Sequence, residues 1–518
     1  MATETENTRL ESRRGFSLRI PSIVGSGLWA LSAKLVSQVA QLAAFVIAAH
    51  VLTPAEFGFF AFSSAVAVLL VVLAEGGWAE FVMKSADDEH RLDQVASIAT
   101  ASGLLFTAFG LAAAGILDSF TQMRWEASLL ALFSLWILPA AMTTIYDGVL
   151  VHRGELHKQA MIRIVAEAGG LAVVAFGLWA GWNVFALVAG RLAMQLLILF
   201  GSVAVVGWVP PVRPTRPVLR DVLQFSRHII ANRLILFFRS YSGTLAVGSF
   251  LGLSEAGYYR AAERIVAAFY ELIGEPARML AWIVFRRARD SRQTEGDAVR
   301  QAGNALVPLL LAVAVPVFLG LALVSGSFVE IVLGEVWAPA AVVVSILSIK
   351  QLLLISSSVT EPLLSIRGTI SKMAQVGVVN TIIFVSFVIL LAPFGLLAVA
   401  LGQILAACIA FTMIVWLQGR YGGIDWLSIA GNSGFVLFAA AGMVAAVLAV
   451  GYADVSALHP VVELALRVLA GALGYLLVLV LMKRLFPDAI PFSASGHKAF
   501  SGLAGDTVTT DIREAGTR

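Results

Sequence analysis

The stretch VLTPAEFGFF, residues 51–60, lies between two long apolar runs, and the rest of the chain is organised around it. A second version, FLGLSEAGYY, occupies residues 250–259, at an offset of 199 positions (250 − 51). At that offset the aromatic pairs coincide, and three further positions match: Leu52 with Leu251, Glu56 with Glu255, and Gly58 with Gly257. Because the flanking apolar runs repeat as well, the chain is predicted to consist of two homologous halves.

Each version is predicted to be a short turn that ends one helix and opens the next. In the first, Thr53 and Glu56 have the spacing of a capping box, and Pro54 fits the first helical position. In the second, Ser254 is expected to be the cap. A glycine in the first turn of the following helix lets two helices approach closely. With six spans per half, both turns are expected on the same, outer face, related by a pseudo-two-fold axis along the membrane normal.

The composition indicates a membrane protein. Hydrophobic residues make up 59% of the chain and charged residues 13%, with a mean hydropathy of +0.87, which is more apolar surface than a water-soluble globule can bury. Apolar runs of about 20 residues recur, each long enough to cross a hydrocarbon core of about 30 Å. The single cysteine, Cys408, lies in an apolar run and excludes an internal disulfide framework.

The expected fold is an all-α polytopic membrane protein with about 14 transmembrane helices, arranged as two pseudo-symmetric six-helix lobes and two C-terminal helices. The spans of the first lobe are predicted at Val24–Ala48, Phe57–Phe81, Leu92–Leu117, Ala127–Leu150, Ala160–Ala180 and Phe185–Val206. Those of the second are predicted at Asp221–Leu251, Ala256–Phe285, Val299–Val324, Ala341–Leu364, Met373–Leu391 and Gly395–Leu417. The last two are Leu427–Gly451 and Pro460–Met482.

The connections between these spans give the expected domain boundaries. Residues 1–22 form a cytoplasmic tail whose following apolar run is too long for a signal peptide, so the first helix is expected to be uncleaved. The expected parts are then a first lobe (23–208), a cytoplasmic linker rich in proline and arginine (209–220), a second lobe (221–419), the last two spans (420–485) and a disordered cytoplasmic tail (486–518).

The distribution of positive charge predicts the topology independently, because cytoplasmic connections are enriched in Lys and Arg. With the N-terminus in the cytoplasm, every second connection is basic: Lys84 and Arg91; Arg153 and Lys158; Arg213, Arg216 and Arg220; Arg286, Arg287, Arg289 and Arg292; Arg367 and Lys372; Arg420; Lys483 and Arg484. The outer connections hold only Arg124 as a basic residue, and several carry acids: Glu330, Glu335 and Asp454. Both termini are therefore expected inside, in a bacterial inner membrane.

Several classes of chemistry find no support in the sequence. It contains no glycine-rich phosphate loop, no Cys/His spacing for a metal and no HExxH motif, so no catalytic residue, metal or cofactor is expected. His152 and His157 lie in a short basic connection and are interpreted as a solvated surface pair. No connection is long enough for a nucleotide-binding domain, so an ion gradient, the membrane potential or a partner must supply energy.

Charged residues inside the predicted spans are the main functional signal, because charge there is costly and usually functional. Some can pair: Arg260 or Arg264 with Glu263, Glu275 with Arg278, and Arg163 with Glu167. Five cations have no acid within one helical turn of sequence: Lys34, Arg191, Arg233, Arg239 and Lys350. An excess of cations predicts a wet, positive cavity, and guanidinium groups suit phosphate oxygens. The predicted anion-binding set is Lys34, Arg191, Arg233, Arg239, Arg260, Arg264 and Lys350, with Arg239 and Arg260 or Arg264 at its core.

The first turn, followed by Ala74-Glu75-Gly76-Gly77, resembles the N-terminal signature of the polysaccharide transporter family, the Wzx-type flippases of lipid-linked oligosaccharides within the MATE-like exporter superfamily. The resemblance extends over roughly Val24 to Leu417. It implies a V-shaped pair of six-helix lobes around a central cavity, which opens alternately to the two sides. It also implies a polyprenyl-pyrophosphate-linked substrate, and a cavity lined by the first, second, seventh and eighth helices.

Three functional readings follow. The first is a flippase for lipid-linked oligosaccharides of O-antigen, capsule or exopolysaccharide, with polysaccharide polymerase and chain-length or export proteins as partners; a lipid II flippase differs from it only in substrate. The second is a MATE-like cation or drug antiporter, which should carry unpaired carboxylates deep in its first half. The third is a membrane-embedded polysaccharide polymerase or ligase, which expects a sizeable outer loop. Carboxylates that are candidates for ion coupling are Glu75, Glu263, Glu271 and Glu361.

Overall fold

The computed structural model describes residues 20–85, 89–121, 124–208, 216–290, 295–452 and 459–485. Within them 94% of the residues are helical and no strand occurs, which confirms the predicted all-α class. The predicted tails beyond these residues, most of the Pro/Arg linker and Asp454 lie outside the described residues.

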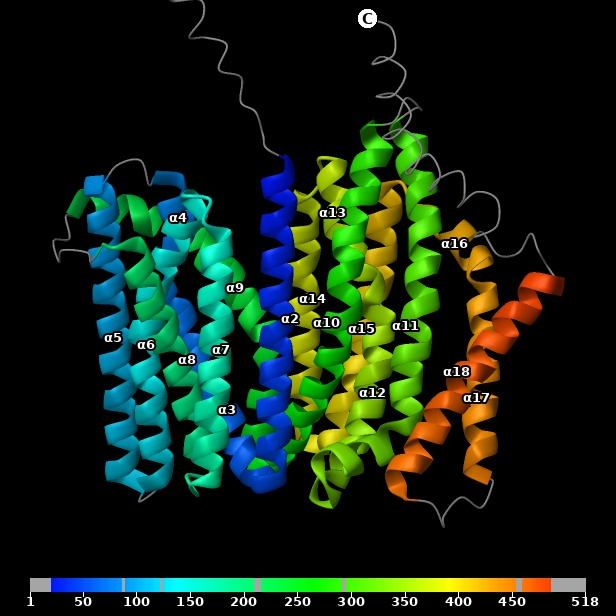
Figure 1. Cartoon of the computed structure of the whole chain (residues 1–518), viewed down its shortest axis with the longest axis horizontal. Helices are drawn as coiled ribbons and strands as arrows, with labels where there is room; N and C mark the ends of the chain where they lie inside the picture. Colours follow the sequence, from blue (N-terminus) through cyan, green and yellow to red (C-terminus); the bar gives the residue numbers. More distant parts are fainter. Residues whose placement is uncertain are drawn as a thin grey trace, which may run out of the picture. The chain divides into compact units, whose positions relative to one another are not determined.

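The helices of the first sequence half, up to the linker, are long apart from the eight-residue α4, and short connections join them (Figure 1). They are α2 (Ile20–Val51), α3 (Pro54–Glu75), α4 (Trp78–Ser85), α5 (Glu89–Thr121), α6 (Arg124–His152), α7 (Leu156–Trp179) and α8 (Val184–Val206).

The remaining helices follow in the same manner, with three short 3-10 turns between them. They are α9 (Arg216–Leu251), α10 (Leu253–Asp290), α11 (Glu295–Leu333), η2 (Glu335–Trp337), α12 (Ala338–Leu354), η3 (Ile355–Val359), α13 (Thr360–Ile366), α14 (Ser371–Leu391), η4 (Ala392–Phe394), α15 (Leu396–Gly422), α16 (Trp426–Asn432), α17 (Gly434–Tyr452) and α18 (Pro460–Leu485).

Among the described residues, twelve helical segments are long and apolar enough to cross a membrane. The other two of the about fourteen predicted spans fall in α2, whose described apolar part is Val36–Val51, and in α10, which is 38 residues long but highly charged. The chain is therefore a multi-pass membrane protein.

Three predicted spans are interrupted in the structure. The predicted span 57–81 breaks between α3 and α4, where Gly76 and Gly77 take φ values of 50° and 81° that favour glycine. The span 341–364 contains the 3-10 turn η3, and the span 427–451 is divided into α16 and α17. The periodicity and apolarity of the sequence do not predict these breaks, because the residues on both sides of each break remain apolar.

The described residues form two compact units. Unit 1 comprises those within Met1–Ala43, Leu73–Gly177 and Val188–Ile229, and unit 2 those within Ala44–Val72, Leu178–Leu187 and Ile230–Arg518. Unit 2 therefore includes a segment of the first half that carries the first turn.

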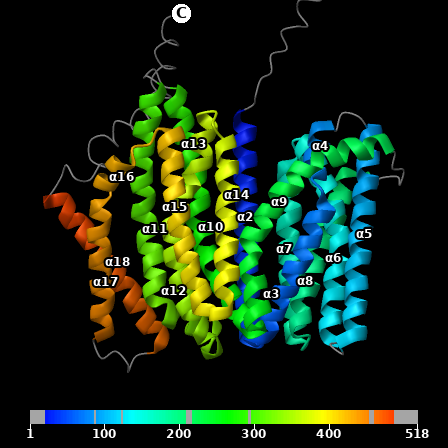
Figure 2. The ribbon, with the colours of Figure 1, turned by 180° about the vertical axis from the view of Figure 1, so that it is seen from behind.

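The core of unit 1 lies among α4, α5, α6 and the residues around the α8–α9 connection. Its buried members include Trp78, Tyr146 and Leu150. The Trp78 indole N–H donates to the Ala74 carbonyl at 2.7 Å, which ties α4 to the end of α3 within this unit. Helices α5 and α6 run side by side over their length (Figure 2).

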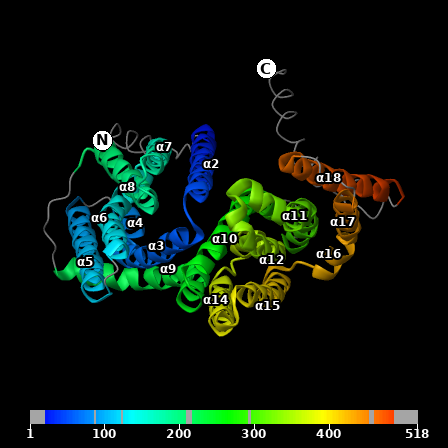
Figure 3. The ribbon, with the colours of Figure 1, turned by 90° about the horizontal axis from the view of Figure 1, so that it is seen from below.

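Unit 2 is built around α10, α11, α12 and α15, and the last two long helices pack on its α11 side (Figure 3). Helices α17 and α18 cross at a contact of small residues, where a Cβ on Gly474 would lie 2.7 Å from the Ala446 side chain and 2.8 Å from the Gly442 carbonyl oxygen. The Tyr475 hydroxyl donates to the Ala312 carbonyl on α11 at 2.9 Å.

The first turn has the predicted caps, whereas the second does not. The Thr53 amide donates to the Glu56 carboxylate at 2.8 Å and the Glu56 amide to the Thr53 hydroxyl at 3.3 Å, so the capping box is confirmed. Ser254 was expected to cap α10, but the helix begins at Leu253. Gly252, at φ 97°, accepts the Ala256 amide at 3.2 Å and so occupies the cap position itself.

The two turns pack directly against each other within unit 2. A Cβ on Gly58 would lie 1.7 Å from the Leu253 carbonyl oxygen, and one on Gly257 would lie 2.0 Å from the Pro54 carbonyl oxygen. This reciprocal contact confirms that the repeat places both turns at the same end of the helices (Figure 1). That this end faces outward stays a prediction.

Trp337, in η2, contacts residues of both turns. It is 1% exposed, and its indole N–H donates to the Ala49 carbonyl of α2 at 2.9 Å. Its ring makes edge-on contacts with Phe57 of the first turn, at 5.6 Å, and with Tyr258 of the second, at 6.2 Å.

Candidate functional site

A polar cluster in the interior of unit 2 joins α10, α12 and α15. The Lys350 ammonium donates to the Gln403 Oε1 at 2.6 Å. The amide nitrogen of Gln403 donates in turn to the Tyr259 hydroxyl. Tyr259 is 0% exposed and Gln403 is 5% exposed, so the centre of this cluster is shielded. Lys350, by contrast, is half-buried.

The same cluster continues along α10. Tyr259 hydrogen-bonds Glu263 one turn further on, and the Glu263 carboxylate accepts from the Arg260 guanidinium at 3.2 Å. The Arg260 guanidinium lies over the Tyr241 ring of α9, 5.0 Å from its centroid. The predicted Arg260–Glu263 pair is therefore confirmed, as one link in a larger network.

A second ion cluster joins α10 to α13. Arg278 pairs with Glu275 at 2.8 Å, as predicted, and with Glu361 at 3.3 Å.

The η3 break, just before Glu361 in sequence, leaves backbone carbonyls without helical partners. Gln418 of α15 compensates by donating to the Ser356 carbonyl at 2.9 Å and to the Thr360 hydroxyl at 2.7 Å.

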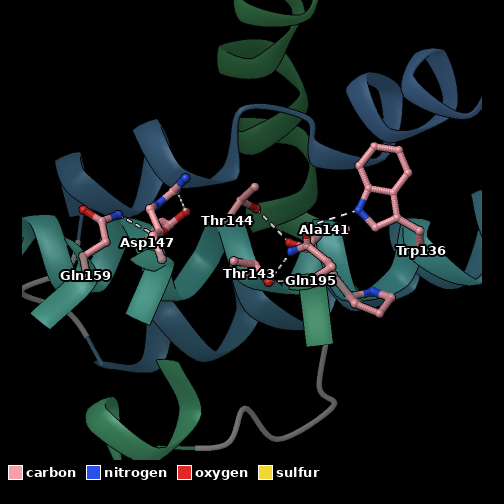
Figure 4. A network of polar contacts seen from close by, with 9 residues as sticks. Trp136, Ala141, Thr143, Thr144, Asp147, Gln159 and Gln195 are labelled. Atoms are coloured by element: carbon pink, nitrogen blue, oxygen red, sulfur yellow. Dashed lines mark hydrogen bonds and ion pairs between the residues drawn. The ribbon is translucent and has the colours of Figure 1, made fainter. Parts of the chain in front are cut away.

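Unit 1 has its own polar network, on α6 and α8 (Figure 4). The Trp136 indole N–H donates to the Gln195 side-chain oxygen at 3.2 Å, and the Gln195 amide donates to the Thr143 hydroxyl at 2.9 Å. The Arg191 guanidinium lies 4.2 Å from the centroid of the Trp136 ring. Arg191 is thus held against an aromatic face, which suits a cation in an apolar setting.

Asp147 of α6 is the centre of the adjoining contacts in Figure 4. It accepts from Gln159 at 2.6 Å and from Arg163 at 2.7 Å, both on α7. The predicted pair of Arg163 with Glu167 is therefore wrong, because Arg163 forms its ion pair with Asp147 on the neighbouring helix. Glu167 instead accepts from Ser37 and Gln41 of α2.

The structure distributes the predicted site residues over both units. Lys34, Glu75 and Arg191 belong to unit 1, and the rest belong to unit 2: Arg233, Arg239, Arg260, Glu263, Arg264, Glu271, Lys350 and Glu361. Within unit 2 the network brings together Lys350, Glu263 and Arg260, and the charges of Lys350 and Arg239 interact.

Sequence reasoning missed Tyr259, Gln403 and Trp136. Gln403 had a usable signal, because it is a lone amide in the apolar run 396–417. Tyr259 was noted only as half of an aromatic pair.

The connections hold acids stabilised by local hydrogen bonds. Asp425 caps α16, and a hydrogen bond from the Ser428 hydroxyl at 2.6 Å is the main cause of its pKa lying below the ordinary value. The Lys158 ammonium likewise lowers the pKa of Glu155 through a hydrogen bond of 2.7 Å.

Comparison with known proteins places this arrangement in a family. Residues 46–342, more than half of the chain, match the family model described as polysaccharide biosynthesis protein. The chain belongs to this family. The resemblance indicated by the turn motif is thereby confirmed, and the matched segment contains both turns.

Curated relatives are similar over part of their length. The chain is 23% identical to the teichuronic acid biosynthesis protein TuaB of Bacillus subtilis, over 55% of this chain and 58% of the relative. It is 23% identical to the succinoglycan biosynthesis transport protein ExoT of Rhizobium meliloti, over 61% and 64%. It is 25% identical to the probable low-salt glycan biosynthesis flippase Agl15 of Haloferax volcanii, over 54% and 61%. Each match spans less than two thirds of the relative.

Solved structures share the fold at low identity. The lipid II flippase MurJ in an inward closed conformation matches with a TM-score of 0.69 and 12% identity, over 88% of this chain and 99% of that protein. An inward-facing multidrug resistance MATE transporter matches with a TM-score of 0.55 and 14% identity, over 75% and 95%. The predicted MATE-like fold is confirmed.

Proposed function

We propose that this protein is a flippase that moves polyprenyl-pyrophosphate-linked oligosaccharide units across a bacterial inner membrane by alternating access between two lobes. The units would feed O-antigen, capsule or exopolysaccharide synthesis. The proposal joins the family membership to the chemistry of the charged helices, and assigns the protein no catalytic step.

The observation that carries the proposal is the connected cationic cluster of unit 2. The three cations Lys350, Arg260 and the neighbouring Arg239 lie on helices that would be embedded in a membrane. Among the described residues, Glu263 is the one acid that hydrogen-bonds within this cluster. A buried arginine or lysine costs on the order of 3 kcal/mol in a bilayer unless it is compensated. A pyrophosphate carries two or more negative charges and compensates such cations, while the sugars remain hydrated and the prenyl chain stays in lipid.

The same proposal includes the lobe boundaries, at 23–208 and 221–419, and the cytoplasmic position of both termini. It also includes a contribution to substrate binding from four further cations: Lys34, Arg191, Arg233 and Arg264. The four coupling carboxylates are also part of it. Glu263 and Glu361 are held in ion pairs, and each pair is expected to rearrange if protonation or ion binding biases the two conformations.

The test is reconstitution. Purified protein in liposomes should translocate a fluorescent polyprenyl-pyrophosphate oligosaccharide, and deletion of the gene should remove one surface glycan. Transport of lipid II alone would identify a lipid II flippase, and export of cationic drugs alone would identify an antiporter. Elongation of glycan chains by the purified protein would identify a polymerase. Any of these three results would replace the proposal.

A further inference from the structure

Three helices of unit 2 meet at one hydroxyl group, that of Tyr259, and a fourth is linked to it through a glutamine. The residue itself lies on α10, Gln403 reaches it from α15, and Lys350 of α12 reaches it through Gln403. On the α9 side, a Cβ on Gly243 would lie 2.2 Å from the Tyr259 hydroxyl oxygen, so only glycine leaves room for this group. The hydroxyl therefore occupies a space that the backbone of α9 provides.

The hydrogen bonds of this cluster have one consistent direction. An ammonium group only donates, so Lys350 fixes Gln403 with its oxygen toward the lysine and its nitrogen toward Tyr259. Tyr259 then accepts from Gln403, and its own proton is free for the Glu263 carboxylate. The chain runs from a cation through two neutral groups to an anion, and Glu263 also accepts from Arg260.

Burial separates the members into two classes. The neutral pair is shielded, with Tyr259 at 0% and Gln403 at 5% exposure. The cations are more open: Lys350 is half-buried, and the Arg260 side chain is 28% exposed. The two neutral groups are thus buried, whereas the two cations linked to them are partly exposed.

We propose that Tyr259 and Gln403 are positioning residues, which hold Lys350 and Arg260 as a fixed pair of cations for the pyrophosphate of the substrate. The inference rests on the proposed function and adds two residues to its binding site. Holding a flexible lysine in place beforehand lowers the entropy lost when the anion binds. Because Gln403 is neutral, it orients the ammonium without cancelling its charge, which a glutamate in the same place would do.

The hydroxyl of Tyr259 is tested by Tyr259→Phe, with Tyr475→Phe as the matched control. Both tyrosines are at most 4% exposed, and both hydroxyls are hydrogen-bonded, but Tyr475 bonds a backbone carbonyl away from the cluster. In proteoliposomes, Tyr259→Phe should raise the KM for the fluorescent substrate about tenfold and change kcat much less, because binding and not the conformational step loses its support. Equal KM values for the two variants would overturn the proposal.

The neutrality of Gln403 is tested by Gln403→Glu, with Gln418→Glu as the control on the same helix. Gln418 is 0% exposed and hydrogen-bonded, but it serves the η3 break. The probe is inorganic pyrophosphate, measured as the rise it causes in the Tm of the purified protein. Gln403→Glu should abolish this rise while Gln418→Glu retains it. A full response in Gln403→Glu would refute the charge argument.

A third measurement separates the cluster from the transport function. Lys350→Met and Tyr259→Phe break the same chain, so their combined Tm shift should be smaller than the sum of the single shifts, whereas Lys350→Met and Tyr475→Phe should add. Additive shifts in the first pair would refute the connected chain itself. If the wild-type protein neither transports the lipid nor responds to pyrophosphate, the proposed function is refuted, even where the Tm shifts of Lys350→Met and Tyr259→Phe are non-additive.

Discussion

Replacing Gly58 by alanine should force apart the two turns that the repeat brings together. The new Cβ would lie 1.7 Å from the Leu253 carbonyl oxygen, whereas ordinary contact begins at 3.4 Å, so the backbones must separate by 1.7 Å (3.4 − 1.7). The obstacle is backbone, which cannot rotate away as a side chain can. We expect a loss of stability at the upper end of the range of about 1–3 kcal/mol typical of overpacking.

The control is Gly377→Ala. Gly377 is also helical, in α14, and a Cβ there meets nothing within 4 Å. Alanine is favoured over glycine in a helix interior by about 1 kcal/mol, so this variant should be neutral or more stable. Thermal unfolding of the purified proteins gives the comparison. The close backbone contact would be refuted if Gly58→Ala matched Gly377→Ala in Tm, or if Gly58→Ala and Gly257→Ala had additive effects, since they disturb one contact.

Three further predictions concern the charged residues. Arg239→Ala should abolish glycan export while leaving the protein inserted and abundant, and Arg239→Lys should restore export only in part because lysine lacks the bidentate geometry; wild-type export by the alanine variant would contradict this. The candidate coupling carboxylates are Glu75, Glu263, Glu271 and Glu361. Replacing each by glutamine should weaken the dependence of transport on a pH or sodium gradient in at least one variant, and unchanged dependence in all four variants would exclude ion coupling through these residues. Asp425 has a lowered pKa, so its charge stabilises the fold above the unfolded value of about 4, and this contribution is lost as the pH falls through the folded value. Asp425→Asn should therefore lower the Tm near neutral pH, and the gap to wild type should close in acid; a constant gap from pH 6 to pH 3 would show that the charge is idle.

The sequence predicts well what depends on apolar length and periodicity. The predicted spans fall in helical regions, although three of them contain breaks, and the repeat of the turns anticipates that Gly58 and Gly257 lie together. Prediction is weaker where a local backbone choice decides. Gly252 rather than Ser254 caps α10, because a positive φ is available to glycine and the helix starts one residue before the serine.

For the candidate site, pairs three residues apart on one helix were predictable, as Arg260 with Glu263 and Glu275 with Arg278 show. Partners on different helices were not. Spacing along the chain gives no information on whether Arg163 finds Glu167 on its own helix or Asp147 on the next. The same limit hides the contact between Lys350 and Gln403, which are 53 residues apart.

The composition of α10 also bears on how the protein is made. This helix is long enough to span a bilayer, yet it is absent from the segments apolar enough to do so by themselves. A translating ribosome delivers helices to the membrane one after another, and a segment with this many charges partitions poorly into lipid on its own. Within the folded protein, its charged side chains contact α9 and α13 instead of lipid, because Arg260 lies over Tyr241 and Arg278 pairs with Glu361. Integration of α10 is therefore expected to be completed only after α13 has emerged, 76 residues later in synthesis (366 − 290 = 76).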